Sequence, residues 1–408
     1  MKKILIIGYV WPEPNSSAAG SHMMSILRLF KAQGWQVEFS TPAQESDHAI
    51  DLESEGITSQ KIILNCDSFD EYIKTYQPDI VMFDRFMMEE QFGWRVEKNC
   101  PNALKILDTE DLQCLRNARH QAHKAKREMN QTDLLSDLAK REISAILRCD
   151  ISLIISSFEM ELLVNTFRVD KEILHHLPFM VDLEKIPKTT KSFEERQHFM
   201  TIGNFRHAPN WDVVLYLKEF WGEIRKQLPK AELHIYGSYP PPKATALHNP
   251  KKGFHIKGWA DDALEVMENA RICLAPIRFG AGIKGKLLEA MIMQTPSVTT
   301  AVGSEGMHES LPWSGIIADD IETFIKSAVK LYSDKELWKE AQKNGTTLLH
   351  NLYESQTLGS KLIEKILNVE ENLTQHRLNN FTGAMLKHHS MMSTKYMSQW
   401  IAEKNKTS

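Results

Sequence analysis

Apolar residues follow two spacings along this 408-residue chain, and the two spacings alternate. Residues 3–7 (KILII) form a continuous apolar run, which is typical of a strand buried on both faces of a parallel sheet. The segment 21–33 (SHMMSILRLFKAQ) then shows helical spacing, and residues 36–40 return as a strand. The helical face carries Met23, Ile26, Leu27 and Phe30. The pattern therefore predicts a β-loop-α-β unit at the start of the chain.

The same order of elements returns about half a chain later. Residues 199–202 (FMTI) are a predicted strand, followed by a helix over 211–227 and a strand over 231–237. Two such beginnings predict two Rossmann-like α/β domains. Further strands are predicted at 272–277, 297–302 and 315–318, with a helix after Gly285.

A change of composition separates the two predicted domains. Residues 177–182 (LPFMVD) contain Pro178 and lead into a polar run, so they are the predicted linker. We expect an N-terminal domain over 1–182 and a C-terminal domain over 183–354. Residues 355–408 are predicted to be helices that return to the N-terminal domain.

A polar, helix-forming stretch occupies residues 116–148. Basic residues gather near its start: Arg116, Arg119, Lys124, Lys126 and Arg127. A solvated helical face accounts for this pattern. The alternative is a surface that meets anionic lipid or an anionic acceptor, which would give the protein a peripheral membrane contact.

The overall composition argues against several classes of function. The formal net charge of -4 gives no basic field for nucleic acid. The five cysteines form no C-x-x-C pair, so neither a zinc site nor a disulfide framework is indicated. No apolar run approaches the roughly 20 residues of a membrane-spanning helix, and the first strand meets Pro12 and Pro14 rather than a cleavage site. We expect a cytoplasmic protein without a metal cofactor.

The stretch 279–291 (FGAGIKGKLLEAM) has the features of an anion site. Its glycines allow backbone N–H groups to approach a ligand, and the helix that follows directs its positive dipole end to the same place. Lys286 and Glu289 lie three residues apart on one helical face, where they can meet phosphate and sugar hydroxyls. A surface salt bridge beside a glycine-rich loop is the alternative. A dinucleotide fingerprint and a Walker loop are both absent, which disfavours NAD and FAD.

At this point the chain resembles a known family. The runs 203–212 (GNFRHAPNWD), 270–291 (ARICLAPIRFGAGIKGKLLEAM) and 295–307 (TPSVTTAVGSEGM) are similar to the donor-binding domain of GT-B glycosyltransferases of the family-4-like group. LPFMVD resembles the interdomain segment of that group, and the N-terminal half agrees more loosely. The resemblance implies two Rossmann-like domains that face each other across a cleft.

The resemblance also implies roles for particular residues. Glu289 matches the second glutamate of the Glu-x7-Glu motif, which contacts the donor ribose, and Lys286 matches a lysine common in the subgroup. Trp259 lies in the segment HIKGWADD, which meets the base. The remaining donor-binding candidates are Gly203, Asn204, Arg206, Gly282, Lys284 and Glu305.

Two positions depart from the family pattern. Ala281 stands where the first glutamate of the motif is expected, and the usual Arg and Lys fall near Asn204 and Pro209. Arg206, Arg278, Lys284 and Lys286 are nearby in sequence and are the candidates to replace that charge. Lys286, Arg206 and Asp108 are the predicted catalytic residues. His22, Asp108, Glu110 and Asp111 are candidates for the acceptor side, and a purely structural role is the alternative for each.

The implied chemistry is transfer of a sugar from a nucleoside diphosphate sugar to an acceptor hydroxyl, with retention of configuration, in glycan or glycoconjugate biosynthesis. The donor is a substrate, so no separate cofactor is expected. Glycan, lipid-linked and protein acceptors all fit. A nucleotide-sugar epimerase of the same fold and a catalytically silent partner subunit are the alternatives.

Overall fold

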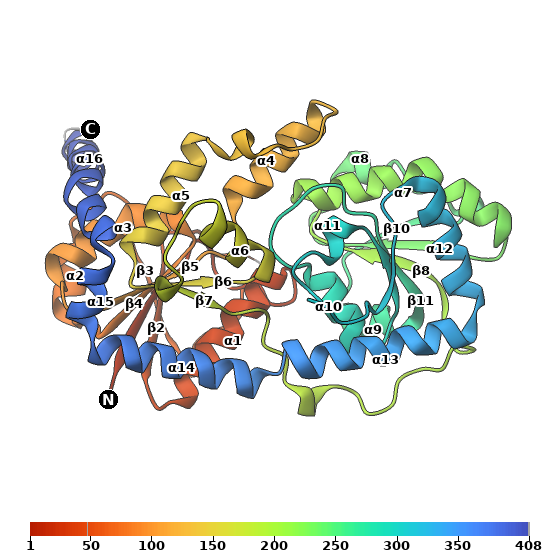
Figure 1. Cartoon of the computed structure of the whole chain (residues 1–408), viewed down its shortest axis with the longest axis horizontal. Coiled ribbons are helices and arrows are strands. Elements are labelled where there is room, and N and C mark those ends of the chain that lie inside the picture. The colour runs from red at the N-terminus through yellow and green to blue at the C-terminus, as the bar shows by residue number, and fades with distance from the viewer. Residues whose placement is uncertain (47, 407–408) are drawn as a thin grey trace.

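The computed structural model contains two parallel β-sheets, each enclosed by helices, as Figure 1 shows. It describes residues 1–46 and 48–406, with the side chains of 389–392 left out. The first sheet has seven strands in the order β3-β2-β1-β4-β5-β6-β7, and the second has six in the order β10-β9-β8-β11-β12-β13. These two sheets confirm the predicted class of two Rossmann-like α/β domains.

The N-terminal domain contains the seven-stranded sheet. Its strands are β1 (Lys3–Ile7), β2 (Gln36–Thr41), β3 (Thr58–Lys61), β4 (Ile80–Asp84), β5 (Leu104–Asp108), β6 (Ile151–Ile154) and β7 (Leu174–His176). Its helices are α1 (Ala18–Ala32), α2 (Ser68–Tyr76), α3 (Phe86–Asn99), α4 (Gln113–Lys124), α5 (Asp137–Arg148) and α6 (Ser157–Asn165). Short 3-10 turns lie at Gln131–Leu134, Lys171–Ile173 and Leu183–Lys185.

The C-terminal domain contains the six-stranded sheet. Its strands are β8 (Gln197–Ile202), β9 (Leu233–Tyr236), β10 (Phe254–Gly258), β11 (Ala270–Ala275), β12 (Ser297–Thr299) and β13 (Gly315–Ile317). Its helices are α7 (Ala208–Gln227), α8 (Pro242–Thr245), α9 (Ala263–Asn269), α10 (Gly285–Ile292), α11 (Ala301–Ser304), α12 (Ile321–Ser333) and α13 (Lys335–Leu352), with a 3-10 turn at Pro250–Lys252.

Strand β1 shows why four successive residues of its sequence are apolar. Ile4 and Ile6 belong to the core on one face of the sheet, while Leu5 and Ile7 belong to the core on the other face. All four side chains are fully buried. A strand covered on both faces has no polar side to present, which is the pattern expected of a central parallel strand.

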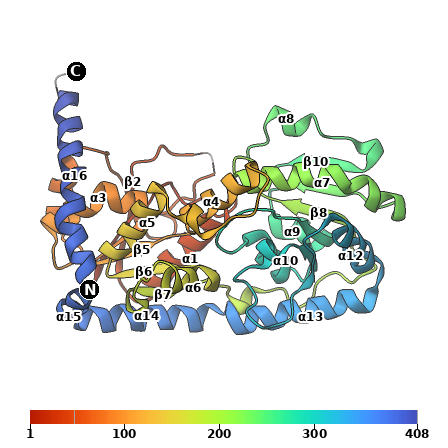
Figure 2. The same cartoon turned by 45° about the horizontal axis from the view of Figure 1, so that its top comes forward.

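Three helices follow the C-terminal domain: α14 (Ser355–Glu371), α15 (Leu373–Asn379) and α16 (Phe381–Lys406). Figure 2 shows α13 and α14 running in succession beneath the two domains, and α16 rising beside the N-terminal domain. Leu362 and Ile366 of α14 are buried in the core of the N-terminal domain. Arg377 of α15 forms an ion pair of 2.8 Å with Asp150. The last helices therefore pack on the first domain.

The structure corrects two predicted elements. The predicted strand 297–302 ends at Thr299, because the Thr300 hydroxyl accepts the Gly303 N–H at 3.0 Å and caps α11. The stretch 116–148 is not one helix. Lys126 has a φ of 54°, and Ser136 caps a new helix, α5, by accepting from the Ala139 N–H.

No helix within residues 1–46 and 48–406 combines the length and the apolar character that crossing a membrane requires.

Candidate active site between the domains

The carboxyl ends of the strands in both sheets lead into loops that meet between the domains. Arg119 of α4 donates to both carboxylate oxygens of Glu305 at 2.7 and 2.8 Å, and to the Gly280 carbonyl at 2.9 Å. Ligands of open α/β sheets bind beyond the carboxyl ends of the strands. The candidate site is therefore at this interface.

Two helices of the C-terminal domain begin at the site. Helix α7 starts at Ala208, after the loop that follows β8, and α10 starts at Gly285. Lys286, in the first turn of α10, donates to the Asn210 side-chain oxygen in the first turn of α7 at 2.8 Å. Burial lowers the pKa of Lys286 to about 8. Both helix dipoles disfavour a cation at this place, and the Asn210 oxygen and the nearby Glu289 carboxylate oppose that effect.

Glu289 lies one turn after Lys286 on the same helix. Its side chain is half-buried, and burial raises its pKa while the Lys286 ammonium opposes that rise. A carboxylate and an ammonium on one helical face, one turn apart, can bind the hydroxyl groups and the phosphate of one ligand.

Lys284 has a different environment from Lys286. Its ammonium donates to the carbonyls of Gly282 at 2.6 Å and Ala281 at 3.3 Å, and its side chain is almost completely buried. Burial lowers its pKa to about 8, and the nearby carboxylates of Glu305 and Glu159 oppose this shift. In this arrangement Lys284 holds the glycine-rich loop rather than facing a ligand.

Gly282 also has a protein partner. Its N–H donates to the Glu159 carboxylate at 2.8 Å, and that same oxygen accepts the Leu112 N–H at 3.0 Å. Gly282 has a φ of 63°, and a Cβ added there would lie 2.9 Å from the Asp111 Cβ. The glycine is therefore required by backbone conformation and by the close approach of the two domains.

Glu159 was missed by the sequence analysis. It is fully buried in α6, and burial raises its pKa to about 8, with a contribution from the neighbouring Asp111. It brings a carboxylate to the backbone beside Ala281, the position where the family motif has its first glutamate. Its place in the first turn of a helix after a buried strand was the available signal.

The other donor-side candidates surround the start of α7. The Asn204 side chain accepts the Arg206 N–H at 2.8 Å, and the Asn204 carbonyl accepts from Asn210 at 3.1 Å. Gly203 lies so close to Asn210 that an added Cβ would be 2.6 Å from its amide group. Arg206 is exposed and its guanidinium lies 3.7 Å from the Tyr239 ring centroid.

Trp259 follows β10 and lies at the other side of this loop cluster. Its ring stacks on His48 of the N-terminal domain at 4.3 Å, with an interplanar angle of 8°. The structure therefore places Trp259 at the domain interface, where a flat ring system can stack.

Asp108 ends β5 in the opposite domain. It lies beside Asp84, Glu110 and Arg85, and its Oδ1 accepts the Glu110 N–H at 3.2 Å. Burial, followed by repulsion from Asp84, raises the pKa of Asp108 to about 7. Its second oxygen is buried without a hydrogen-bond partner in the described structure. His22, by contrast, is buried against the Phe179 ring.

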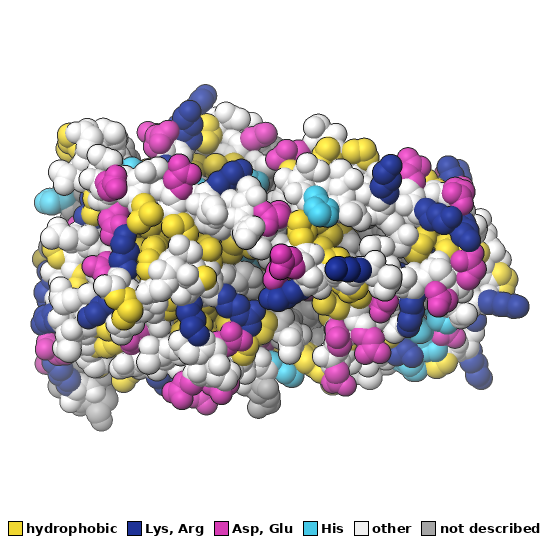
Figure 3. Space-filling view, turned by 90° about the horizontal axis from the view of Figure 1, so that it is seen from below, with side chains coloured by type: hydrophobic (Ala, Val, Ile, Leu, Met, Phe, Trp, Pro, Cys, Tyr) yellow, Lys and Arg dark blue, Asp and Glu magenta, His cyan; other side chains and the backbone are white. Residues whose placement is uncertain are grey.

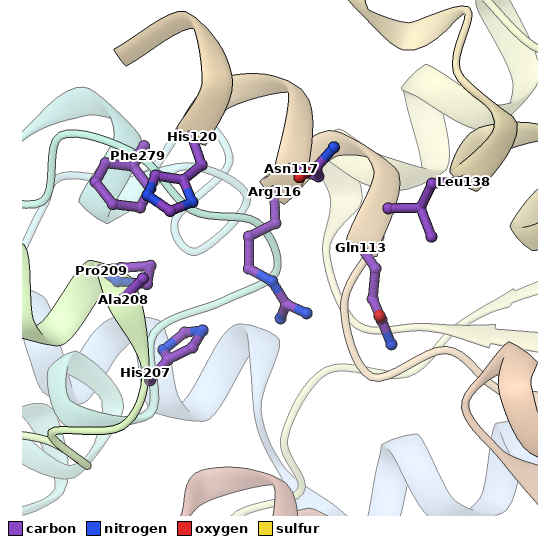
Figure 4. A pocket seen from close by; sticks show the side chains of 9 residues that line it. All are labelled: Gln113, Arg116, Asn117, His120, Leu138, His207, Ala208, Pro209 and Phe279. Atoms are coloured by element: carbon purple, nitrogen blue, oxygen red, sulfur yellow. The ribbon is translucent and has the colours of Figure 1, made fainter. Parts of the chain in front are cut away.

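A hollow of about 210 Å³ opens between α4 and the start of α7. Figure 4 shows Arg116 and Gln113 reaching into it from α4, with His207 opposite and His120 against Phe279. The His120 and Phe279 rings stack at 4.5 Å. Arg116 and the amide groups of α4 therefore face His207 of the C-terminal domain across one space next to the start of α7.

Residues 196–334 match the family model described as "Glycosyl transferases group 1". The C-terminal domain is therefore similar to group 1 glycosyl transferases. This confirms the resemblance that was stated for the sequence. The matched range contains Lys286, Glu289 and the loop 203–207 of the candidate site.

The fold of the whole chain is that of GT-B glycosyltransferases. TarM of S. aureus, in complex with fondaparinux, alpha-GlcNAc-glycerol and UDP, has a TM-score of 0.70 at 11% identity, covering 91% of this chain and 100% of TarM. HepE of Anabaena, in complex with UDP and glucose, has a TM-score of 0.66 at 11% identity, covering 90% and 100%. WaaG, described as involved in lipopolysaccharide biosynthesis, has a TM-score of 0.61 at 15% identity, covering 88% and 98%.

A curated relative is known from Klebsiella pneumoniae, described as an uncharacterized 44.6 kDa protein in the cps region. It is 25% identical over 223 residues, which are 52% of this chain and 56% of the relative. The similarity thus spans about half of the relative's length.

Proposed function

We propose that the protein is a glycosyltransferase that moves a sugar from a nucleoside diphosphate sugar to an acceptor hydroxyl, with retention of configuration. The observation that carries the proposal is the position of Lys286 between the amino ends of α7 and α10. A diphosphate at this place would pair with the ammonium and lie at the positive dipole ends of both helices.

The donor side of the proposal rests on two further groups. Glu289 is one turn from Lys286, where its carboxylate can accept hydrogen bonds from ribose hydroxyls. Trp259 offers a flat ring at the domain interface for a base. UDP is the first nucleotide to test, because the similar TarM and HepE structures contain it.

The acceptor side is assigned to the N-terminal domain. Asp108 has a buried oxygen without a hydrogen-bond partner in the described structure, at the carboxyl end of β5. Buried carboxyl groups bind hydroxyls strongly because a missing partner there is costly. A glycan acceptor fits this chemistry and agrees with the lipopolysaccharide context named for WaaG.

In the proposed reaction, the bond between the anomeric carbon and the diphosphate oxygen breaks. The acceptor oxygen bonds to the same face of that carbon, and its proton passes to the leaving phosphate. Negative charge on the diphosphate grows during the step, so Lys286 and the helix N–H groups bind the transition state more strongly than the ground state. Arg206 adds charge at the edge of this site.

The test combines binding with product analysis on the full-length protein. Calorimetric titration compares UDP with GDP and CDP, and nucleotide release is then measured from a panel of sugars on the nucleotide that binds. Proton NMR of the product determines the anomeric configuration.

An epimerase would convert the donor without any acceptor and would release no nucleotide diphosphate in turnover. A silent subunit would bind the donor without turnover. Either result would reject the proposed activity, and an inverted product would reject retention alone.

A further inference from the structure

Helix α16 carries a row of exposed apolar side chains: Phe381, Met385, Tyr396 and Trp400, which are between 53% and 62% exposed. Successive members are separated by four, eleven and four residues. These separations are close to whole turns of an α-helix, so the four side chains lie on one side of α16. Single exposed apolar residues are ordinary, whereas a row of them marks a surface that meets a partner.

Contacts with the N-terminal domain fix the opposite side of α16. Gly383 lies so close to α5 that an added Cβ would collide with a backbone oxygen of that helix. Lys387 forms an ion pair with Glu97 of α3 at 3.7 Å, and the Ser398 hydroxyl donates to the Asn65 side chain at 2.7 Å. Each of these α16 residues comes two positions after a member of the apolar row, which is slightly more than half a turn. The row therefore faces away from the protein.

Figures 1 and 2 both show α16 at the outer edge of the N-terminal domain, at the end of the molecule away from the C-terminal domain. The candidate active site lies between the two domains. The exposed row is therefore a surface separate from the sugar-transfer site.

The segment 373–406, which contains α15 and α16, also differs in charge from the rest of the chain. Its basic residues are Arg377, Lys387, Lys395, Lys404 and Lys406, and its one acidic residue is Glu403. These residues give the segment a formal charge of +4, whereas the whole chain has a charge of -4. By contrast, Figure 3 shows acidic and basic side chains mixed on the face seen from below. The row thus lies in a basic segment of an acidic protein.

Two of these lysines lie beside aromatic rings of the row. The Lys404 ammonium is 5.3 Å from the Trp400 ring centroid, and the Lys395 ammonium is 5.9 Å from the Tyr396 ring centroid. Helical spacing places Lys395 on one flank of the row and Lys404 on the other. Basic side chains in these positions can extend to phosphate groups while the rings enter an apolar layer.

We propose that α16 attaches the protein to the surface of a bilayer that contains anionic lipids. The apolar row enters the boundary between head groups and acyl chains, and Lys395 and Lys404 bind lipid phosphates. The helix lies in the plane of the surface, while its other side stays packed on α3 and α5.

A second copy of this chain fits the row less well than an anionic surface. Two α16 helices packed along the same row would bring two segments of formal charge +4 together. Like charges across an interface are unfavourable. A surface of anionic lipids attracts the same charges.

The stretch 116–148 fits a lipid surface less well than α16. Three of the basic residues near its start, Arg116, Arg119 and Arg127, form ion pairs within the protein at 2.6 to 2.7 Å. The stretch contains no Phe, Tyr or Trp. Helix α16 has the aromatic side chains that this stretch lacks.

The direct test is co-sedimentation of the full-length protein with sucrose-loaded vesicles. We expect the wild type to bind vesicles of equal parts phosphatidylcholine and phosphatidylglycerol at least about tenfold more strongly than vesicles of phosphatidylcholine alone. High salt should reduce this difference, because it screens the lysines from the lipid phosphates.

Variants of α16 test the two parts of the surface. Trp400→Ala and Phe381→Ala should each lower the partition coefficient for the mixed vesicles by about tenfold, because an aromatic ring no longer enters the acyl layer. Lys404→Gln should lower it by about fivefold. Leu135→Ala and Lys326→Gln change exposed residues outside α16 and are the matched controls.

Wild-type protein that binds neither kind of vesicle, or both equally, would overturn the proposal. Equal partition coefficients of Trp400→Ala and Leu135→Ala, with circular dichroism showing both folded, would overturn it as well. So would a wild-type dimer in analytical ultracentrifugation that Trp400→Ala converts to a monomer, because the row would then be an interface between copies. None of these measurements depends on sugar transfer, so they test the lipid contact independently of the proposed function.

Discussion

The two sheets of this protein share a topology and differ in the charge at their carboxyl edges. The edge of the N-terminal sheet carries the buried carboxyl groups of Asp84 and Asp108, with Glu110 two residues after Asp108. The facing edge of the C-terminal domain carries Lys284 and Lys286 at a helix start. The same arrangement of strands therefore presents acidic groups to one side of the interface and basic groups to the other.

Both edges hold their charges where burial opposes ionisation. The pKa of Asp108 is raised to about 7, and the pKa of Lys286 is lowered to about 8. Such opposed shifts are typical of functional sites, where residue type is selected for chemistry rather than for stability. The comparison teaches that the two domains hold opposite charges against burial, which is the division that the proposed reaction requires: cations for a leaving diphosphate and carboxyl groups for an acceptor hydroxyl.

Replacing Lys286, the cation at the two helix starts, should have the largest effect on sugar transfer. Lys286→Ala should lower turnover by about 100-fold and donor affinity by less, because the ammonium stabilises charge that grows in the transition state. Lys286→Arg should restore only part of the rate, since a planar guanidinium does not replace a compact ammonium.

Steady-state kinetics measures these effects once circular dichroism has shown that each variant is folded. Lys326→Ala on the exposed surface of α12 is the control. Near-normal turnover of Lys286→Ala would remove the proposed role and direct attention to Arg206.

Glu289→Ala should chiefly weaken donor binding. Loss of hydrogen bonds to a charged group costs about 1.5–3 kcal/mol, and alanine can make none of them. The Kd for the nucleotide, measured by calorimetry, should therefore rise by at least tenfold. An unchanged Kd in a folded variant would show that the carboxylate does not contact the ribose.

Asp108→Asn tests the buried carboxyl group of the N-terminal domain through the pH dependence of protein stability. Native Asp108 keeps its proton to about pH 7, whereas the unfolded chain loses it near its ordinary pKa of 3.8. The wild type therefore loses stability as the pH rises from about 4 to 7, and the amide variant escapes this loss.

The melting temperature of Asp108→Asn should exceed that of the wild type at pH 8 by about 2 °C or more, and the difference should vanish near pH 4. Acceptor transfer should fall at the same time. A difference in melting temperature that is constant with pH would contradict the raised pKa.

Substitutions in the ion pair between the two domains should have the smallest effect on stability. Arg119 and Glu305 form a two-bond ion pair that is partly exposed to solvent. A double-mutant cycle with Arg119→Ala and Glu305→Ala should give a coupling free energy of about 1 kcal/mol in urea unfolding. Full additivity would mean that this pair does not hold the domains together.

Sequence pattern was sufficient for elements whose neighbours are close in the chain. The run KILII predicted β1 within its observed bounds, and Gly285 marked the first residue of α10. Lys286 and Glu289 could be placed on one face because helical spacing is a local property. Local capping decided the errors: Thr300 begins a helix inside a predicted strand, and Ser136 begins a second helix inside a predicted single one.

Contacts between distant segments could not be read from spacing. Glu159 meets the Gly282 N–H across 123 residues, and Lys286 meets Asn210 across 76. Each contact depends on how two domains or two loops dock. The sequence analysis therefore assigned Gly282 and Lys284 to a ligand, while in the structure both have protein partners.

The amino-acid sequence by itself determined that this protein is built from two parallel α/β domains and that a basic, glycine-rich helix start lies in the second of them. Hydrophobic spacing, glycine positions and charge are properties of short sequence segments, and they determine structure over the length of those segments. The tertiary structure alone decided which charges share a site, namely the opposed edges at the cleft, and which side of α16 faces away from the protein. Strand register, helix packing and domain docking set these arrangements, because they bring together residues that no local spacing relates.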